Sequence, residues 1–251
     1  MTVRLARDGA VAHLLIDRPD KRNAMTLAMW QAIPALVEQA ADDHAVRALV
    51  IRAAAPGPFC AGADLGEILA HKDDPAWLAE SQAAINRTQR AVARLPLPTI
   101  AFIEGDAIGG GCGLAVACDL RVATTAARFA VTPAKLGLVY PLHDVKLLVD
   151  LIGPGQAKRL MYTGGIIDAA EALRIGLAEM IADSPASLLE PILTVSPFSI
   201  RETKGFIRRV LEGQSEDDDE TWSVFAGAFQ GADFREGVGA FLARRKGVFA
   251  R

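Results

Sequence analysis

Two glycine-containing turns in this sequence each lead directly into an apolar helical segment. The first is FCAGADL (residues 59–65), and the second is GGGCG (residues 109–113). Backbone N–H groups at the start of a helix have no partner within the helix and can point at an acceptor. Two such turns could supply two preorganised donors to one oxygen on which negative charge develops. Taken alone, either motif is more often explained by close backbone packing.

Taken together and in this order, the two turns resemble the enoyl-CoA hydratase/isomerase family, which has the crotonase fold. Further matches run the length of the chain: IDRPDKRNAM (16–25), AFIEGDAIGGGCGLAVACDLRVA (101–123), FAVTPAKLGL (129–138), LMYTGGIIDAAEALRIGLAE (160–179) and EGVGAFLARRKGVF (236–249). The resemblance implies an α/β protein, a crotonase-like spiral of ββα units with a helical C-terminal trimerisation region. It also implies an acyl-CoA thioester as the substrate.

The resemblance assigns roles to particular residues. In the family, the N–H groups at the positions of Ala63 and Gly110 hold the thioester oxygen, which becomes negatively charged when the enolate forms. The residues that the resemblance places near the CoA moiety are Arg18, Lys21, Ala61, Asp64, Phe241, Arg244 and Lys246. The last three are expected on the terminal helix, which in the family reaches a neighbouring subunit's CoA. A helix N-cap is the preferred interpretation of Asp64, and a solvated surface explains the terminal basic residues equally well.

The sequence departs from the family pattern at the usual acids. Hydratases of the family add water with two glutamates, one of them three residues after the middle glycine of the GGG motif, where this chain has Gly113. The other falls on Pro133, or on Ala134 if the match slips by one residue. Isomerases and dehalogenases often carry an acid where this chain has Pro141. None of these residues can transfer a proton, so we expect little ordinary hydratase activity.

The segment Tyr140-Pro141-Leu142-His143-Asp144 holds the nearest alternative groups. The resemblance places Tyr140 at a position where decarboxylases of the family have a tyrosine. A histidine near a helix start is a natural acid or base. The catalytic hypothesis is that Tyr140, His143 or Asp144 moves the proton. The alternative is that Asp144 caps the following helix and His143 is exposed. Glu67, one turn past Asp64, either faces the acyl chain or lies on a solvated helix face.

Strands and helices are expected to alternate along the first three quarters of the chain. The expected strands are 11–17, 48–52, 99–104, 120–123 and 128–131, and the expected helices include 26–41, 65–70, 75–95, 145–152 and 156–162. From about residue 197 the chain is expected to be wholly helical, with an Asp-x-x-Glu capping box at Asp233. We therefore expect a spiral core with the acyl-CoA site over residues 1–195 and a helical oligomerisation region over residues 196–251.

Composition and motifs exclude several other functions. With 27 Lys+Arg, 30 Asp+Glu and a net charge of −3, the chain has no basic field for nucleic acid or anionic membranes. The four histidines lack ligand spacing and no CxxC occurs, so we expect no metal site and no cofactor other than the CoA of the substrate. The three cysteines and the absence of a secretory signal or an 18-residue apolar run indicate a cytoplasmic protein.

Two functions remain after these exclusions. The first is an acyl-CoA enzyme that stabilises a thioester enolate and catalyses isomerisation, decarboxylation or an atypical hydration. The second is a non-catalytic acyl-CoA-binding or assembly subunit, which the loss of the usual acids would explain. In either case the mean hydropathy of +0.23 suits a homotrimer or hexamer that buries apolar helices.

Overall fold

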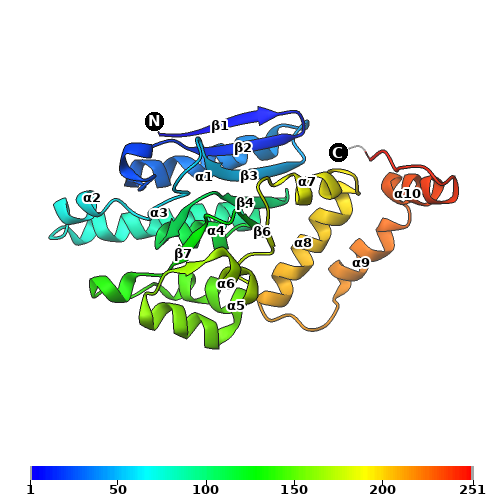
Figure 1. The fold of residues 1–251 in the computed structure, drawn as a ribbon. Helices are drawn as coiled ribbons and strands as arrows, with labels where there is room; N and C mark the ends of the chain where they lie inside the picture. The colour runs from blue at the N-terminus through cyan, green and yellow to red at the C-terminus, as the bar shows by residue number, and fades with distance from the viewer. Residues whose placement is uncertain (1, 250–251) are drawn as a thin grey trace.

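The computed structural model describes residues 2–249 and contains two β-sheets covered by helices (Figure 1). The larger sheet has six strands in the order β1-β2-β3-β4-β6-β9, in which β1 pairs with β2 antiparallel and all other pairs are parallel. Its strands are β1 (Val3–Asp8), β2 (Val11–Ile16), β3 (Ala48–Ala53), β4 (Thr99–Ile103), β6 (Leu120–Ala123) and β9 (Met180–Ile181). The central strand β4 is buried over its whole length, as expected for a parallel sheet covered on both faces.

The smaller sheet lies beside the second glycine-rich turn. It has the order β5-β7-β8, with β5 (Asp106–Ile108) parallel to β7 (Arg128–Ala130) and β7 antiparallel to β8 (Ile167–Asp168). Crossover segments from one sheet to the other follow β4 and β6. These alternations, together with the helical C-terminal region, confirm the crotonase-like α/β fold expected from the sequence.

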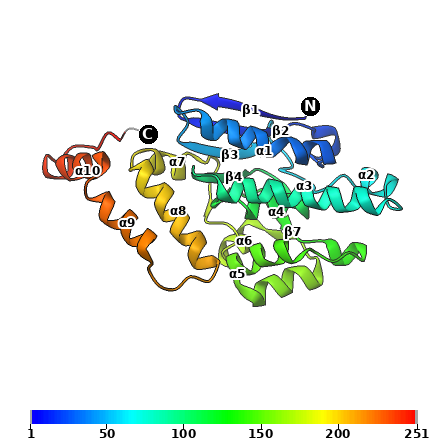
Figure 2. The same ribbon diagram turned by 180° about the vertical axis from the view of Figure 1, so that it is seen from behind.

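Helices α1 (Leu27–Asp42) and α3 (Pro75–Arg94) pack against each other on one face of the larger sheet (Figure 2). Thr26 caps α1, as the sequence predicts, by accepting a hydrogen bond from Met29 N. The Thr88 hydroxyl on α3 donates to the Trp30 carbonyl on α1 over 2.7 Å, inside the core. This buried contact fixes α3 relative to the start of α1.

The other helices and 3₁₀ turns are distributed along the chain. They are α2 (Leu65–Ala70), α4 (Gly110–Val116), α5 (Leu142–Thr163), α6 (Ala169–Arg174), α7 (Ala186–Leu193), α8 (Pro197–Leu211), α9 (Asp219–Ala228) and α10 (Ala232–Leu242), with 3₁₀ turns η1 (Pro19–Lys21) and η2 (Pro133–Leu136). Helix α5 is kinked at Gly153, whose φ of 73° is not helical. The two separate helices expected around Gly153 are therefore the two arms of α5.

Helices α8 to α10 extend away from the sheets at the end of the molecule opposite α2 (Figure 1). The acidic run 216–220 lies at the start of α9, where Asp218 caps the helix and forms a capping box with Thr221. The capping box expected at Asp233 is wrong, because Gly231 is the N-cap of α10 and the Asp233 carboxylate accepts a hydrogen bond from Ser196 instead. The division into residues 1–195 and 196–251 stays a prediction.

No helix among residues 2–249 is long and apolar enough to cross a membrane.

Candidate active site

The first glycine-containing turn is held from both sides by backbone hydrogen bonds. Cys60 bridges to β5, with Cys60 N donating to Asp106 O and Ile108 N donating to Cys60 O, both over 2.9 Å. On the other side, Met25 N donates to Gly62 O and Asp64 N donates to Met25 O. Ala63 sits between these bonds, and its own N–H donates no backbone hydrogen bond within residues 2–249. The chain is thus fixed on either side of Ala63 without using its amide.

The second turn is fixed by the same strand, because β5 runs directly into it. Gly109 N donates to Ala130 O on β7 over 2.9 Å, and α4 begins at the next residue, Gly110. Gly62 and Gly111 permit the two turns to touch. A Cβ on Gly62 would lie 2.9 Å from Ile108 O, and a Cβ on Gly111 would overlap Cys60 O. Glycine is therefore required where the two backbones approach.

The Ala63 and Gly110 amides are neighbours. A Cβ on Gly110 would lie 3.7 Å from the Ala63 nitrogen. Within residues 2–249, neither amide donates a backbone hydrogen bond, while both residues keep part of their surface exposed. The structure therefore brings together the two residues that the sequence singled out, and it leaves both donors available to a ligand.

Polar side-chain atoms without partners surround the start of α4. Trp30 is fully buried, and its ring carbon Cζ2 would lie 3.4 Å from a Cβ on Gly110, yet its indole N–H has no acceptor among the described residues. The Tyr140 hydroxyl would lie 3.9 Å from a Cβ on Gly109 and is likewise buried and unpaired. Because buried polar atoms are normally hydrogen-bonded, this cluster is typical of a site that binds a polar group. Burial raises the pKa of Tyr140, so its hydroxyl stays protonated.

His143 and Asp144 lie in the first turn of α5. The N-cap of this helix is Pro141, so the alternative in which Asp144 caps it is wrong. Asp144 is buried and accepts hydrogen bonds from Gln89 Nε2 (2.8 Å) and Gln82 Nε2 (3.4 Å) on α3. Burial raises the pKa of Asp144, while the bond from Gln89 acts in the opposite direction. The His143 imidazole is half-buried rather than exposed, and burial lowers its pKa.

Most of the residues expected near CoA at this end of the chain are held by local bonds. Asp64 is the N-cap of α2, as preferred from the sequence, and also accepts a 2.6 Å bond from the Arg18 guanidinium. That bond lowers the pKa of Asp64. Ala61 N donates to Arg22 O, and Lys21 is exposed at the end of η1. Glu67 meets neither expectation, because its carboxylate accepts from Leu27 N at the start of α1.

Phe241, Arg244 and Lys246 lie at the opposite end of the molecule, on and after α10 (Figure 1). The prediction that all three are on the terminal helix is wrong: α10 ends at Leu242, and Arg244 follows it with a left-handed φ of 53°. Phe241 is 82% exposed. Within one chain, therefore, these residues do not reach the two turns.

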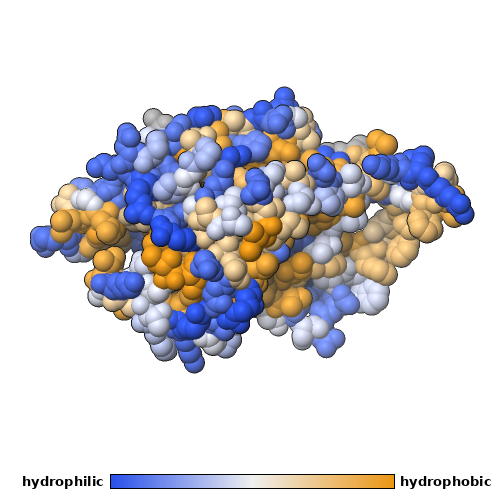
Figure 3. Space-filling view, in the orientation of Figure 1, coloured by the Kyte–Doolittle hydropathy of each residue, from blue (hydrophilic) through white to orange (hydrophobic). Residues whose placement is uncertain are grey.

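Exposed apolar side chains lie on α2, directly after the first turn, and around the start of α5. Leu65 and Leu69 on α2 are 56% and 66% exposed, and Val139 and Leu142 before and at the start of α5 are 91% and 83% exposed. Figure 3 shows hydrophobic surface at the end of the molecule that carries α2.

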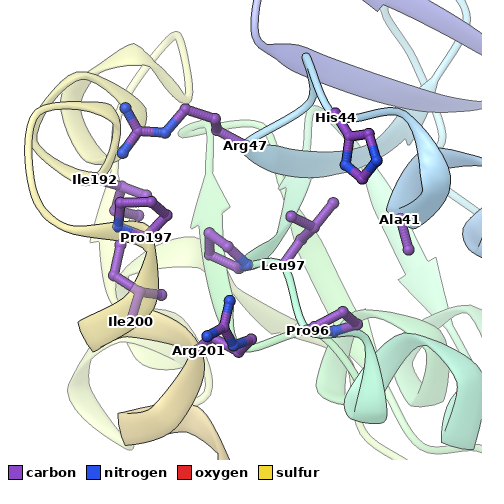
Figure 4. Close-up of a pocket in the computed structure, with 10 residues that line it drawn as sticks. Ala41, His44, Arg47, Pro96, Leu97, Ile192, Pro197, Ile200 and Arg201 are labelled. Carbon is purple, nitrogen blue, oxygen red and sulfur yellow. The ribbon is translucent and has the colours of Figure 1, made fainter. Parts of the chain in front are cut away.

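Two surface cavities lie away from the turns. One, of about 330 Å³, is lined by Arg47, Leu97 and Arg201 among others, between the end of α1 and the start of α8 (Figure 4). The other, of about 380 Å³, lies among Phe198 on α8, Phe229 and Phe234. Neither is lined by a residue predicted to be catalytic or to bind CoA. Among residues 2–249 there is also no group of three or more His, Cys, Asp or Glu side chains arranged to hold a metal.

Comparison with known proteins identifies the family. The family model for enoyl-CoA hydratase/isomerase matches residues 6–251. This chain belongs to the enoyl-CoA hydratase/isomerase family. Among curated relatives, it is 32% identical to a putative enoyl-CoA hydratase/isomerase of Bacillus subtilis, covering 95% of this chain and 94% of the relative. It is 33% identical to the crotonyl-CoA hydratase of Syntrophomonas wolfei, covering 98% of this chain and 96% of that protein.

Solved structures of the family agree with this fold. A putative enoyl-CoA hydratase/isomerase family protein from Hyphomonas neptunium superposes with a TM-score of 0.95 at 36% identity, covering 100% of this chain and 98% of the other. An enoyl-CoA hydratase from Bacillus anthracis superposes with a TM-score of 0.89 at 28% identity, covering 100% and 99%. This enoyl-CoA hydratase/isomerase family member is accordingly an acyl-CoA enzyme.

The sequence did not predict three polar side chains that lie beside Gly110 or Asp144. Trp30, Gln82 and Gln89 lie on α1 and α3. Trp30 fits the apolar face of its helix, so its periodicity indicates only core packing. The two glutamines lie seven residues apart, which places them on one helix face. This spacing of two amide side chains was the signal that the sequence offered for them.

Proposed function

We propose that this protein stabilises the enolate of an acyl-CoA thioester through the Ala63 and Gly110 amides. The observation that carries the proposal is the adjacency of these two unpaired donors, 3.7 Å from the Ala63 nitrogen to a Cβ position on Gly110. Preorganised donors are worth most on an oxygen whose charge grows during the reaction. Removal of a proton from the α-carbon of a thioester puts that charge on the thioester oxygen.

The reaction that best fits the available acids is migration of a carbon–carbon double bond. A 3-enoyl-CoA loses an α-proton to a base, the electron pair delocalises into the thioester as a dienolate, and the same proton returns to the γ-carbon. The product is the 2-enoyl-CoA, and no other reactant is consumed. One carboxyl group can serve as base and then as acid. Asp144 supplies this group, with the Tyr140 hydroxyl and the neutral His143 imidazole beside it in the chain.

Ordinary hydration fits this chain less well, although several relatives are named hydratases. Hydration needs one group to activate water and another to protonate the α-carbon. Gly113, Pro133 and Ala134 stand where the resemblance implies the two glutamates. With a single carboxylate, moving one proton from the α-carbon to the γ-carbon of the same substrate is simpler than hydration.

The proposal also covers how the CoA moiety is bound and how copies of the chain assemble. Arg18, Lys21 and Ala61 border the first turn, and exposed Lys21 is free to contact a phosphate. Phe241, Arg244 and Lys246 are too far away in one chain, so they would serve the site of a neighbouring copy in a homotrimer or hexamer. An acyl chain would lie on the apolar side chains of α2.

The test is turnover of matched CoA esters. The purified protein is incubated with 3-hexenoyl-CoA, 2-hexenoyl-CoA and methylmalonyl-CoA, and the products are separated by liquid chromatography. We expect 2-hexenoyl-CoA from the first ester and much slower hydration of the second. Tight binding of every ester with no product from any of them would instead support the non-catalytic acyl-CoA-binding subunit.

A further inference from the structure

The side of α4 that carries Gly113 is filled by side chains from two other helices. Gly113 follows Gly110 by three residues, so the two lie on the same face of α4. A Cβ on Gly113 would lie 2.7 Å from Gln89 Nε2 and 3.5 Å from Asp144 Oδ1. Gln89 on α3 and Asp144 on α5 thus occupy the volume that a side chain at position 113 would need. The carboxylate reaches this face of α4 from outside the helix.

Gln89 is the group that fixes this carboxylate. Its side chain is fully buried, and Nε2 donates to Asp144 Oδ1 over 2.8 Å. Gln82 makes a longer contact of 3.4 Å to Oδ2 and also donates to Asn86 over 2.9 Å. Gln89 Oε1 has no donor within the described part of the chain. A buried amide whose N–H donates to a carboxylate and whose oxygen accepts no hydrogen bond is poorly explained by core packing alone.

Among the charged groups near Asp144, His143 acts on it directly, because its protonated form also lowers the pKa of this carboxyl. His143 precedes it on α5 and Arg90 lies on α3, and the positive charge of Arg90 acts on His143. Tyr140 and Cys112 are buried and neutral, because burial raises the pKa of both. No salt bridge involves Asp144 among residues 2–249. The Gln89 amide is therefore the main group that stabilises its ionised form.

We infer that Gln89 is a positioning residue that holds the Asp144 carboxylate against the Gly110–Gly113 face of α4, in the volume otherwise open to a side chain at position 113. The inference rests on the proposed function for the reaction itself. Its structural part, that Gln89 sets the place and the proton affinity of Asp144, stands separately. It explains how this chain keeps a carboxyl group beside the enolate site while position 113 is glycine.

Two variants separate positioning from general destabilisation. Gln89→Met keeps an unbranched side chain of similar length without the amide, and Gln39→Met, at an exposed glutamine on α1, is the matched control. Misplacement of a reacting group by about 1 Å costs on the order of 100-fold in rate. We expect Gln89→Met to lower kcat for 3-hexenoyl-CoA by about 10- to 100-fold with KM nearly unchanged. Gln39→Met should keep the wild-type kcat.

The titration of Asp144 provides a readout that does not depend on turnover. The ¹³C carboxyl resonance of Asp144, assigned by its loss in Asp144→Asn, is followed against pH in the whole protein. Loss of the hydrogen bond to the ionised form should move its midpoint upward by about one pH unit in Gln89→Met. The acid limb of kcat/KM should move by the same amount.

The outcomes distinguish the inference from the proposed function. An unmoved midpoint in a folded Gln89→Met variant would overturn the inference, whatever the activity. A midpoint that moves as expected in a protein inactive on every ester would support the positioning role and overturn the proposed reaction. If Gln89→Met does not fold, Gln89→Asn, which keeps the amide on a shorter side chain, should lower kcat without lowering ester affinity. Wild-type kcat in that variant would contradict the inference.

Discussion

The Ala63 nitrogen lies 3.7 Å from the position that a Cβ on Gly110 would occupy, and neither residue's amide donates to the backbone within residues 2–249. The adjacency follows from strand β5, which pairs with Cys60 and then runs into the second turn. One short strand therefore sets the spacing of both donors.

A methyl group at position 110 should block this pair of donors without unfolding the protein. A Cβ there meets Trp30 Cζ2 at 3.4 Å, which is ordinary contact. We expect Gly110→Ala to lower kcat/KM by about 10²- to 10³-fold, the cost of losing one such donor, and Gly110→Val to abolish turnover. Gly205→Ala on α8, where a Cβ meets nothing within 4 Å, is the control and should keep wild-type rates. Unchanged kinetics in folded Gly110→Val would remove Gly110 from the site.

The pH dependence should report Asp144 as the base. Because burial raises its pKa, the fraction ionised, and with it kcat/KM, should rise with pH through a midpoint above the ordinary range of aspartate. Asp144→Asn should lose about 10²-fold or more in kcat. Tyr140→Phe and His143→Ala, measured alongside, should lose less. Wild-type rates in all three variants would show that the start of α5 does not move the proton.

The side chain of Gln89 limits what can be placed at position 113. Gly113→Glu alone should destabilise the protein, because its Cβ would lie 2.7 Å from Gln89 Nε2. The double variant Gly113→Glu with Gln89→Ala removes that overlap and should be more stable than Gly113→Glu, as measured by thermal unfolding. If the single variant unfolds at the wild-type temperature, Gln89 does not occupy this space.

The Asp64 side chain should contribute to stability through two separable interactions. Asp64→Ala removes both the cap of α2 and the ion pair with Arg18, and the lost cap alone should cost about 0.5–2 kcal/mol. Asp64→Asn is the matched control, since it keeps a capping oxygen and loses the charge. The pKa of Asp64 is lowered in the folded state, so the advantage of wild type over Asp64→Asn should be complete near neutral pH and disappear as the pH falls through the acidic range. Urea unfolding at several pH values measures it, and a constant difference would contradict the ion-pair contribution.

The parts of the fold that the sequence predicts are those with local signals. Thr26 and Asp64 cap the helices expected at 26–41 and 65–70, and the long apolar strands β3 and β4 lie close to their expected positions. Strand β1 was not predicted because its charged residues obscure the alternation of apolar and polar side chains that marks a strand. Strands β5, β8 and β9 were not predicted because they are only two or three residues long. Pairs this short are stabilised by their neighbours rather than by their own pattern.

The site divides in the same way. Ala63 and Gly110 could be predicted because two glycine-containing turns mark this region of the sequence, and the resemblance to the family then assigns these two positions. Gln89 and Trp30 could not, since their roles arise only when α1, α3 and α5 pack around α4. The expected cap at Asp144 was wrong for the same reason: two glutamines from α3 hold the carboxylate inside the core.

Enolate formation itself can be measured on an ester that can undergo neither double-bond migration nor decarboxylation. Butanoyl-CoA has no double bond to move and no group to lose, so exchange of its α-protons in D₂O, followed by mass spectrometry, reports enolisation alone. The account predicts exchange well above the protein-free rate with wild type and a loss of about 10²-fold or more with Gly110→Ala. Absence of exchange in wild type, or equal exchange in both proteins, would contradict it.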